Sequence, residues 1–403
     1  MIERPQYMQW LDRWRGKNVI KVVTGLRRCG KSSVFELYRK RLADSGVAER
    51  NILAINFESL DEEYPTEAHD VYNYIKARLA PGTNYVFLDE VQHVEAFERL
   101  VDGLFVREDV DLYITGSNAF FLSGELATLL TGRYVELRML PFSFAEYSAA
   151  VESYGSAIDD SEALLGRYLT YGGMPFTAGL SDEQSISDYL GGVFNTIVLS
   201  DAALRHPRMD MRSFLDTASF LADNVGNISS LKRISGGLKA SGRNASPTAV
   251  GEYVTTMLEN YLLFKAERYD VKGGEYLSTL EKYYLGDLGF RFWLLGKSQG
   301  DVGRRLENAI YLELLRRHRS VQIGKVGKRE VDFVTNDDGR RHYYQVALTV
   351  LDESTLEREL SALVAIKDNF PKTLITLDRI GLGDYEGIEH VNAVDWLLDS
   401  PFA

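Results

Sequence analysis

The stretch that decides the fold is Gly25-Leu26-Arg27-Arg28-Cys29-Gly30-Lys31-Ser32, which is followed by Ser33. It matches the spacing G-x-x-x-x-G-K-[ST], and it lies between an apolar run that ends at Thr24 and a helical pattern. Glycines let the backbone curl so that successive N–H groups point at phosphate oxygens, and the following helix adds the positive end of its dipole. The pattern therefore predicts a phosphate-binding loop over residues 25–33.

The side chains of this loop have different expected tasks. We expect Lys31 to reach the β- and γ-phosphates of ATP and the Ser32 hydroxyl to bind Mg²⁺. Arg27 and Arg28 are expected to contact either phosphates or a partner. The helix terminus would lower the pKa of the Cys29 thiol, but we interpret Cys29 as a small space-filling residue rather than a redox group.

A second run, Tyr85-Val86-Phe87-Leu88-Asp89-Glu90, supplies two adjacent carboxylates. Four apolar residues predict a buried strand, and the acids emerge at its C-terminal end beside the loop. We expect Asp89 to hold Mg²⁺ through a water and Glu90 to activate the water that attacks the γ-phosphate. Because one acid would suffice for nucleotide binding, the pair favours hydrolysis.

A third run ends in Thr115-Gly116-Ser117-Asn118. If this strand lies between the other two, its terminal polar residue would contact the γ-phosphate or the attacking water. Ser117 is the first candidate, and Asn118 and Thr115 follow. The alternative is a capping turn for the next helix.

Strands and helices alternate through the first part of the chain. Apolar runs at 18–24, 51–57, 85–89, 111–115 and 134–140 alternate with helical patterns at 33–44, 71–79 and 97–105. A further short helix is predicted by the spacing of Tyr7, Trp10, Leu11 and Trp14. The fold class is therefore α/β, a P-loop parallel sheet with helices on both faces.

The rest of the chain has two other patterns. Residues 145–265 are mostly helical, and helices expected at 231–238 and 247–264 precede a hairpin at 266–285, which together resemble a winged helix. Beyond residue 300 we expect a small α/β unit, with helices at 304–319 and 355–369 and strands at 320–325, 329–335, 342–349 and 372–378.

Composition limits the class of protein. The 403 residues carry a net charge of −12, which argues against binding of polyanions by the whole surface. Basic residues nevertheless outnumber acidic ones by seven to four over 201–245 and by eight to two over 304–329, so we expect any DNA contact through the C-terminal half. The single cysteine excludes an intramolecular disulfide framework. Without a long apolar run or a signal-peptide core, we expect a cytoplasmic protein with no membrane partner.

The loop, Leu88-Asp89-Glu90, Thr115-Gly116-Ser117 and the stretch from Pro141 to Tyr147 together resemble the prokaryotic AAA-type ATPases that carry a C-terminal domain of unknown function. Gly172-Gly173-Met174-Pro175 matches the lid motif of that family. The resemblance implies an ATPase core over 1–145, a helical lid over 146–200, a winged-helix-like domain over 201–299 and a nuclease-like tail over 300–403.

The resemblance also implies roles for three further residues. Arg133 stands where such proteins carry an arginine finger that acts on a neighbouring subunit, which would require a homo-oligomer; the alternative is a surface arginine at a helix end. Asn56 stands where a polar residue restrains the catalytic glutamate. Arg167 is a candidate for a second sensor arginine in the lid.

The tail resembles the restriction-endonuclease-like core, in which a helical Glu, a strand Asp and a Glu-x-Lys bind Mg²⁺ and activate water. Glu307, Asp332 and Gln345 occupy the positions of the metal ligands, and Ala347 stands where the lysine belongs. Because Gln is a poorer ligand than Glu and Ala cannot polarise a water, we expect an inert binding fold.

These observations favour an ATP- and Mg²⁺-dependent switch that couples its ATP or ADP state to a partner protein or DNA held by the C-terminal half. One alternative is a DNA-binding regulator in which ATP is a structural ligand. Another is a metal-dependent nuclease linked to an ATPase.

Overall fold

The computed structural model describes residues 1–59, 64–117, 132–155, 160–198, 209–240, 242–243, 245–297 and 300–399. These residues form two compact units. Among the described residues, the first unit contains Met1–Leu140 and the short segment Glu259–Tyr261, and the second contains Pro141–Leu258 and the chain from Leu262 to Asp399. Asn118 lies outside the described residues.

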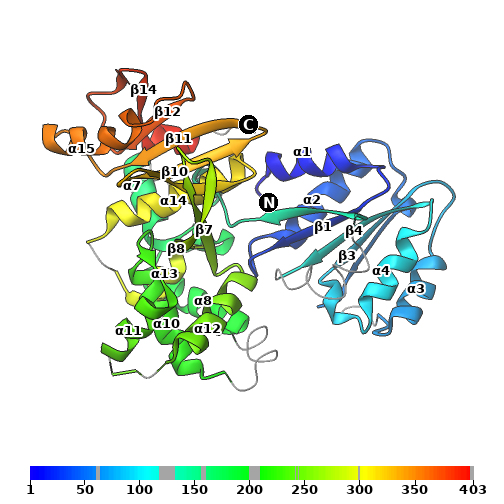
Figure 1. Cartoon of the computed structure of the whole chain (residues 1–403). Coiled ribbons are helices and arrows are strands. Elements are labelled where there is room, and N and C mark those ends of the chain that lie inside the picture. The colour runs from blue at the N-terminus through cyan, green and yellow to red at the C-terminus, as the bar shows by residue number, and fades with distance from the viewer. Residues whose placement is uncertain are drawn as a thin grey trace. The chain divides into compact units, whose positions relative to one another are not determined.

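The first unit is built on a five-stranded sheet (Figure 1). Its strands are β1 (Ile20–Gly25), β2 (Ile52–Asn56), β3 (Asn84–Asp89), β4 (Val110–Gly116) and β5 (Tyr134–Met139). All pair in parallel, in the order β2-β3-β4-β1-β5. The predicted parallel sheet is confirmed, and β4 lies between the strand of the phosphate loop and the strand of Asp89.

Helices cover both faces of this sheet (Figure 1). They are α1 (Pro5–Trp14), α2 (Lys31–Asp44), α3 (Ala68–Lys76) and α4 (Phe97–Phe105), with 3-10 turns at Glu49–Asn51 and Val91–His93. On one face, Phe35 and Tyr38 of α2 pack against Phe87 of β3. On the other face, α3 and α4 bury aliphatic side chains such as Val71 and Leu104 in a core shared with the strands. Burial on both faces explains why the strands read as continuous apolar runs.

The second unit is richer in helices. They are α6 (Phe144–Ser153), α7 (Ser161–Tyr171), α8 (Glu183–Thr196), α10 (Met211–Asp223), α11 (Leu231–Ala240), α12 (Pro247–Glu259), α13 (Leu288–Leu295), α14 (Val302–Arg317), α15 (Glu353–Val364) and α16 (Ala393–Leu398), with a 3-10 helix at Pro175–Gly179. None of the described helices in either unit combines the length and apolar character needed to cross a membrane.

The second unit also contains a nine-stranded sheet. Its strands are β6 (Ile228–Ser229), β7 (Leu263–Asp270), β8 (Glu275–Leu285), β9 (Val321–Val326), β10 (Arg329–Asp337), β11 (Arg340–Val346), β12 (Lys372–Thr376), β13 (Gly383–Tyr385) and β14 (Ile388–Asn392). The order is β13-β14-β12-β11-β10-β9-β7-β8-β6. Because β7 pairs in parallel with β9, the hairpin expected at 266–285 and the strands expected in the tail belong to one sheet. The winged-helix interpretation and the division at residue 300 stay predictions.

Two predicted helix ends in the second unit are wrong. The helix expected over 355–369 ends at Val364. We expected a helix over 247–264, but α12 ends at Glu259 and Leu263 begins β7. Tyr261 has a φ of 56°, in the left-handed region that a helix does not use, and Leu263 and Phe264 pair with β8. Apolar residues at the end of a helix and at the start of a buried strand look alike in sequence.

The Gly172-Gly173 motif has a packing role within the second unit. The Gly173 N–H donates to Asp287 Oδ2 at 2.8 Å, and a Cβ on Gly172 would lie 1.9 Å from Oδ1 of the same carboxyl. Burial raises the pKa of Asp287 to about 7, although bonds from backbone N–H groups act to lower it. The two glycines therefore let the chain approach a buried carboxyl closely.

Candidate functional site

The loop after β1 has the curled backbone that the sequence predicts. Gly25, Arg28 and Gly30 have φ values of 145°, 65° and 102°. A Cβ on Gly25 would lie 2.2 Å from the carbonyl oxygen of Met139 in β5, so no larger residue fits without a shift of the backbone. Helix α2 begins at Lys31, directly after Gly30. The loop therefore delivers the N–H groups and the dipole of a helix N-terminus at the C-terminal end of the sheet.

A buried arginine holds the backbone of the loop in place through hydrogen bonds. Arg4, 2% exposed, donates to the carbonyl oxygens of Cys29 at 3.1 Å and Leu140 at 3.0 Å. The Cys29 side chain is also buried, and burial raises the pKa of its thiol. We had expected the helix terminus to lower this pKa, and that expectation is wrong. Desolvation of the buried thiol raises its pKa by more than the charges of Lys31 and Arg4 lower it. Arg4 itself was missed, since a single arginine before Pro5 carries no motif.

Lys31 and the two acids meet at this edge of the sheet. The Lys31 ammonium is buried, with its Nζ 3.3 Å from the Gly25 carbonyl oxygen and 3.4 Å from Glu90 Oε1. The Asp89 carboxylate is hydrogen-bonded by the hydroxyls of Ser32 and Thr115. Burial raises the pKa of Asp89, while these two hydrogen bonds act to lower it. Ser33 is exposed on the first turn of α2, and Leu26 is buried.

Thr115 connects the two acids. Its Oγ1 donates to Asp89 Oδ1 at 2.5 Å and accepts the Glu90 N–H at 2.8 Å. Glu90 has a φ of 53°, which for a residue with a side chain is a strained conformation that neighbouring contacts must maintain. Ser117, which we ranked above Thr115, is 2% exposed, and its hydroxyl has no hydrogen-bond partner among the described residues.

The Glu90 carboxylate is held by a residue that the sequence did not single out. Gln92 Nε2 donates to Glu90 Oε2 at 2.5 Å. Asn56, for which we predicted this contact, ends β2 beside Asp89, but its Oδ1 accepts the Glu58 N–H at 2.9 Å. Gln92 follows Glu90 by two residues, and only the turn at Val91–His93 brings its amide back to the carboxylate.

The arginines of the loop lie at its outer side. Arg27 donates to Glu58 Oε1 at 2.7 Å, and His93 Nε2 lies 3.7 Å from the same oxygen. The contact with His93, together with Arg27, lowers the pKa of Glu58, and Glu58 in turn raises the pKa of His93. Arg28 is exposed. The structure thus places a small ionic cluster of Arg27, Glu58 and His93 beside the loop.

Arg133 lies far from this edge. It directly precedes β5, and Tyr134 pairs with Ile20, so Arg133 is at the N-terminal end of strands whose C-terminal ends carry the loop. Its Nη1 lies 2.5 Å from Asp102 Oδ1, and its side chain is 45% exposed. Six residues of strand span about 20 Å. Arg133 therefore does not reach the loop of its own chain.

The residues at the loop fit the groups that the motif implies. Ser32 and Asp89 place a hydroxyl and a carboxylate beside each other, and oxygen atoms of this kind are the ligands that Mg²⁺ prefers. The loop N–H groups and the Lys31 ammonium suit phosphate oxygens. This match makes the C-terminal edge of the first sheet the candidate site.

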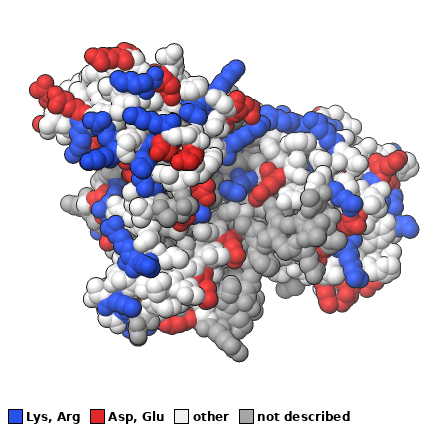
Figure 2. All heavy atoms as spheres, viewed as in Figure 1, with Lys and Arg blue, Asp and Glu red and all other residues white. Residues whose placement is uncertain are grey.

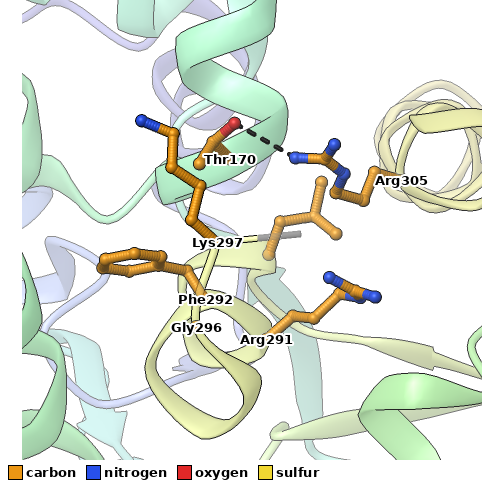
Figure 3. Close-up of a pocket in the computed structure, with 7 residues that line it drawn as sticks. Thr170, Arg291, Phe292, Gly296, Lys297 and Arg305 are labelled. Atoms are coloured by element: carbon orange, nitrogen blue, oxygen red, sulfur yellow. Dashed lines mark hydrogen bonds between the residues drawn. The ribbon is translucent and has the colours of Figure 1, made fainter. Parts of the chain in front are cut away.

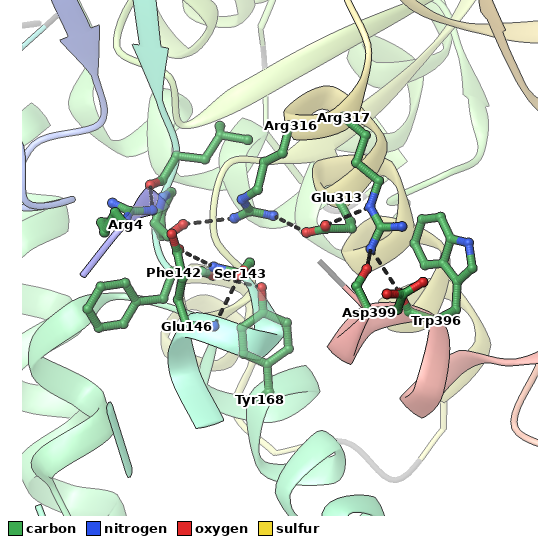
Figure 4. A network of polar contacts seen from close by, with 12 residues as sticks. Arg4, Phe142, Ser143, Glu146, Tyr168, Glu313, Arg316, Arg317, Trp396 and Asp399 are labelled. Carbon is green, nitrogen blue, oxygen red and sulfur yellow. Dashed lines mark hydrogen bonds and ion pairs between the residues drawn. The ribbon is translucent and has the colours of Figure 1, made fainter. Parts of the chain in front are cut away.

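Five of the eight basic side chains in the stretch 304–329 are bound by other groups of the second unit. Arg316 donates to Glu313 and to the Pro141 carbonyl oxygen, and Arg317 donates to Glu313 and to the carbonyl oxygens of Trp396 and Asp399 (Figure 4). Arg305 is buried against Thr170, Arg304 pairs with Asp301, and Arg319 pairs with Asp338. On the face shown in Figure 2, basic and acidic side chains are interspersed. Three of these arginines, Arg305, Arg316 and Arg317, are thus bound inside the second unit. The Arg319–Asp338 pair, Lys328 and Arg329 are exposed.

Part of the basic excess over 201–245 is also bound by other groups of the second unit. Arg243 pairs with Asp216 at 2.6 Å, and Arg233 donates to the Ile228 carbonyl oxygen. Arg205 and Arg208 lie outside the described residues. Arg167, our candidate sensor, donates to the Tyr147 hydroxyl at 2.9 Å and to the Leu180 carbonyl oxygen, so it ties α7 to its neighbours in the second unit. Its sensor role stays a prediction.

A small pocket in the second unit offers no alternative site. It is lined by Thr170, Leu288, Arg291, Phe292, Gly296, Lys297 and Arg305, and it holds about 180 Å³ of empty space including open solvent (Figure 3). Arg305 donates to Thr170 across it, and Arg291 is bound by Asp301 at 2.9 Å. Ligand pockets typically hold about 300–1,000 Å³. This pocket is too small for a nucleotide.

The comparisons with known proteins agree with the geometry. Residues 17–148 match the model of an AAA domain (AAA_14), and residues 162–301 match a domain of unknown function (DUF8612). An uncharacterized protein of Haemophilus influenzae is 38% identical over 402 residues, which cover 99% of each chain. This protein and that relative belong to one family, and the chain carries an AAA domain.

More distant proteins extend the picture. An uncharacterized protein of Methanocaldococcus jannaschii is 29% identical over 400 residues, which cover 94% of this chain and 85% of that protein. The Walker-type ATPase of Pyrococcus abyssi, with 14% identity, superposes on 73% of this chain and 96% of its own at a TM-score of 0.51. That likeness concerns the fold, a parallel sheet flanked by helices and followed by further α/β elements.

Proposed function

We propose that this protein is an AAA-type ATPase that binds ATP with Mg²⁺ at residues 25–33 and hydrolyses it. One observation supports the proposal most directly: the Thr115 hydroxyl binds both Asp89 and the backbone of Glu90. Asp89 in turn contacts Ser32, and Glu90 contacts Lys31. A site for binding alone would not need a second acid held in a strained conformation beside the phosphate-binding lysine.

In the proposed reaction each side chain has one task. The loop N–H groups and Lys31 bind the β- and γ-phosphates, and Ser32 and Asp89 hold Mg²⁺, which when bound would offset phosphate charge. Glu90 accepts a proton from the attacking water, Gln92 orients its carboxylate, and Thr115 holds its backbone. The buried Ser117 hydroxyl is proposed to contact the γ-phosphate or that water.

The contact between Lys31 and Glu90 suggests how binding prepares the acid. Because a triphosphate carries more negative charge than one carboxylate, it would compete with Glu90 for the Lys31 ammonium. Glu90 would then keep its bond to Gln92 and turn its other oxygen toward water. We propose this exchange as the step by which nucleotide binding readies Glu90 for catalysis.

We further propose that the ATP or ADP state controls how the second unit engages a partner protein, in the cytoplasm. DNA remains the other partner considered, but the stretch 304–329 supports it weakly, because Arg305, Arg316 and Arg317 bind groups inside the second unit. If Arg133 supplies a finger, it must act on a neighbouring copy, so the active form would be a homo-oligomer.

The proposal is tested by separating binding from turnover. Lys31→Ala should abolish binding of a fluorescent ATP analogue, since it removes the buried ammonium. Glu90→Gln should bind the analogue normally and release phosphate at least about a hundredfold more slowly. Glu36→Gln, an exposed acid on α2, is the matched control and should behave as the wild type. Normal turnover by both Lys31→Ala and Glu90→Gln would refute the assignment.

A second measurement distinguishes the alternatives. Phosphate release is followed with and without duplex DNA at two salt concentrations. Stimulation by DNA that weakens with salt would identify DNA as the partner. Salt-dependent DNA binding with no phosphate release from the wild type would instead favour a regulator in which ATP is structural.

A further inference from the structure

A buried ionic cluster lies in the second unit, away from the nucleotide site. Lys282 of β8 extends toward Glu307 of α14 and toward Glu330 and Asp332 of β10. Two of these acids, Glu307 and Asp332, occupy the positions of metal ligands in the nuclease-like core that the tail resembles. Lys282 is distant from all of them in sequence, and no motif indicated that it would join them.

The lysine ammonium is the common partner of all three carboxylates. Its Nζ lies 2.9 Å from Glu330 Oε1, 3.2 Å from Glu307 Oε1 and 3.8 Å from Asp332 Oδ1, and the Lys282 side chain is 5% exposed. The Tyr284 hydroxyl donates to the same oxygen of Glu307 at 2.7 Å. The Val346 N–H donates to the other oxygen of Asp332 at 2.9 Å.

Gln345, the third candidate ligand, is also engaged. Its Oε1 accepts the Asp332 N–H at 3.3 Å, and its Nε2 donates to Glu359 Oε2 at 2.8 Å. The amide oxygen that would face a metal ion is thus turned toward the backbone of β10. Ala347, which we placed at the lysine position, packs against the apolar core under α15.

Burial and the neighbouring charges shift the pKa of both Lys282 and Asp332. Although burial acts to lower it, the carboxylates of Glu307, Asp332 and Glu330 raise the pKa of Lys282 above its usual value. Burial, reinforced by Glu307, raises the pKa of Asp332 to about 8.

The resemblance of the tail to metal-dependent nucleases implies a divalent cation here, and these residues do not fit one. Mg²⁺ binds oxygen ligands at about 2.0–2.1 Å. A cation so close to Glu307 and Asp332 would lie against the Lys282 ammonium that already contacts both. Among the described residues, no three His, Cys, Asp or Glu side chains are grouped to hold a metal ion.

We propose that Lys282 takes the place of the divalent cation, so that the cluster is a fixed ionic link between β8, α14 and β10 rather than a metal centre. The second unit then engages its partner without cleaving phosphodiester bonds. The link also joins the hairpin β7–β8 to the strands of the tail, because Lys282 and its three acids come from both. This inference concerns the second unit and does not depend on ATP hydrolysis.

The proposal is tested by removing the lysine from the full chain. Lys282→Met keeps the length of the side chain and leaves three acids without a counter-charge. We expect this variant to be less stable than the wild type and to gain one Mn²⁺ site, bound at least about tenfold more tightly than any Mn²⁺ at this cluster in the wild type. Mn²⁺ binding is measured by electron paramagnetic resonance without nucleotide, and thermal unfolding with and without Mn²⁺ shows whether the metal restores stability.

Controls assign the new site to the cluster. Asp332→Asn in the Lys282→Met background should remove the gained Mn²⁺ site. Lys265→Met removes a neighbouring lysine of β7 that pairs with Glu281 at 3.2 Å but is 35% exposed, and it should gain no site. Lys282→Arg keeps the charge and should also gain none.

The wild type alone provides a second test if Lys282→Met fails to fold. Asp332→Asn in the wild-type background should leave Mn²⁺ binding unchanged, because the proposal places no metal there. A Mn²⁺ site in the wild type that Asp332→Asn removes would overturn the proposal. Mn²⁺-dependent DNA cleavage that Asp332→Asn or Lys282→Met abolishes would also overturn it, since Lys282 would then act beside a metal.

Discussion

Replacing Thr115 by valine tests the architecture of the candidate site most directly. Thr115 is fully buried, and valine has nearly the same shape, so the change removes one hydroxyl and leaves the packing in place. Two groups lose their partner: Asp89 Oδ1, which accepts at 2.5 Å, and the Glu90 N–H, which donates at 2.8 Å. Sequence ranked this threonine third, behind Ser117 and Asn118, so the prediction comes from the structure.

The size of the effect follows from these two contacts. A buried group left without its hydrogen bond costs about 1–3 kcal/mol, and more when the partner is charged. We therefore expect the first unit to lose about 2–5 kcal/mol of unfolding free energy. Losing about 1.5–3 kcal/mol of support for Glu90 in the transition state corresponds to a decrease in kcat of about 10- to 150-fold.

The assay is steady-state phosphate release at saturating Mg²⁺ over a range of ATP concentrations. Because Lys31 and the loop are untouched, the KM for ATP should stay within about threefold of the wild type. Thr115→Ser keeps the hydroxyl and should retain most of the activity. Thr217→Val is the matched control: this threonine of α10 is equally buried, but its hydroxyl donates only to the Ser213 carbonyl oxygen, at 2.7 Å. A kcat for Thr115→Val within about twofold of the wild type would refute the reasoning.

Three further predictions concern other parts of the chain. Gly25→Ala should abolish binding of an ATP analogue and lower the unfolding free energy by about 3 kcal/mol or more, because its Cβ would lie 2.2 Å from the Met139 carbonyl oxygen. Gly16→Ala is the control, since Gly16 has a φ of 68° but open space around it, and this variant should lose only about 1 kcal/mol in thermal or urea unfolding. Equal losses of unfolding free energy in the two variants would contradict the steric argument. Arg133→Ala should make the specific ATPase activity independent of protein concentration, whereas the wild type should become more active per molecule as concentration rises; a variant that keeps the wild-type profile would exclude a finger in trans. The unfolding free energy of the wild type should fall as the pH rises from about 4 to about 7, since the Asp287 carboxyl, with its pKa raised to about 7, keeps its proton in the native state while the unfolded chain has released it. Asp287→Asn should flatten this part of the pH profile in urea unfolding, and identical slopes for both proteins would show that Asp287 does not contribute.

The nucleotide motif could be located in the sequence because its chemistry is local. Glycines at fixed spacing, a lysine, a serine and a helix start are consecutive along the chain, so their types and order predict the loop without knowledge of distant residues. The acids Asp89 and Glu90 could be placed beside it, because the C-terminal ends of parallel strands meet at one edge of a sheet. The bounds of β3 and α4 agree with the predicted runs to within a residue for the same reason.

Other features depended on contacts between residues far apart in the chain. Arg4, Gln92 and Lys282 have no motif, and their roles follow from the atoms that the fold places around them. The basic excess over 304–329 could not be interpreted from the count, because the sequence does not show that Glu313 and backbone carbonyl groups bind Arg316 and Arg317. The composition shows how many charged side chains the protein has, whereas burial in the fold decides which of them face water.

The sequence by itself thus determined the α/β class, the phosphate loop and the pair of acids. Strand periodicity and the residues of a phosphate loop can be recognised from residues that are neighbours along the chain. Only the tertiary structure decided that Thr115 connects those acids, that the β7–β8 hairpin and the tail strands share one sheet, and that Lys282 pairs with Glu307, Glu330 and Asp332. Each of these depends on the pairing of distant strands and on the exclusion of water around charged groups. Strand pairing and the exclusion of water arise only once the chain has folded.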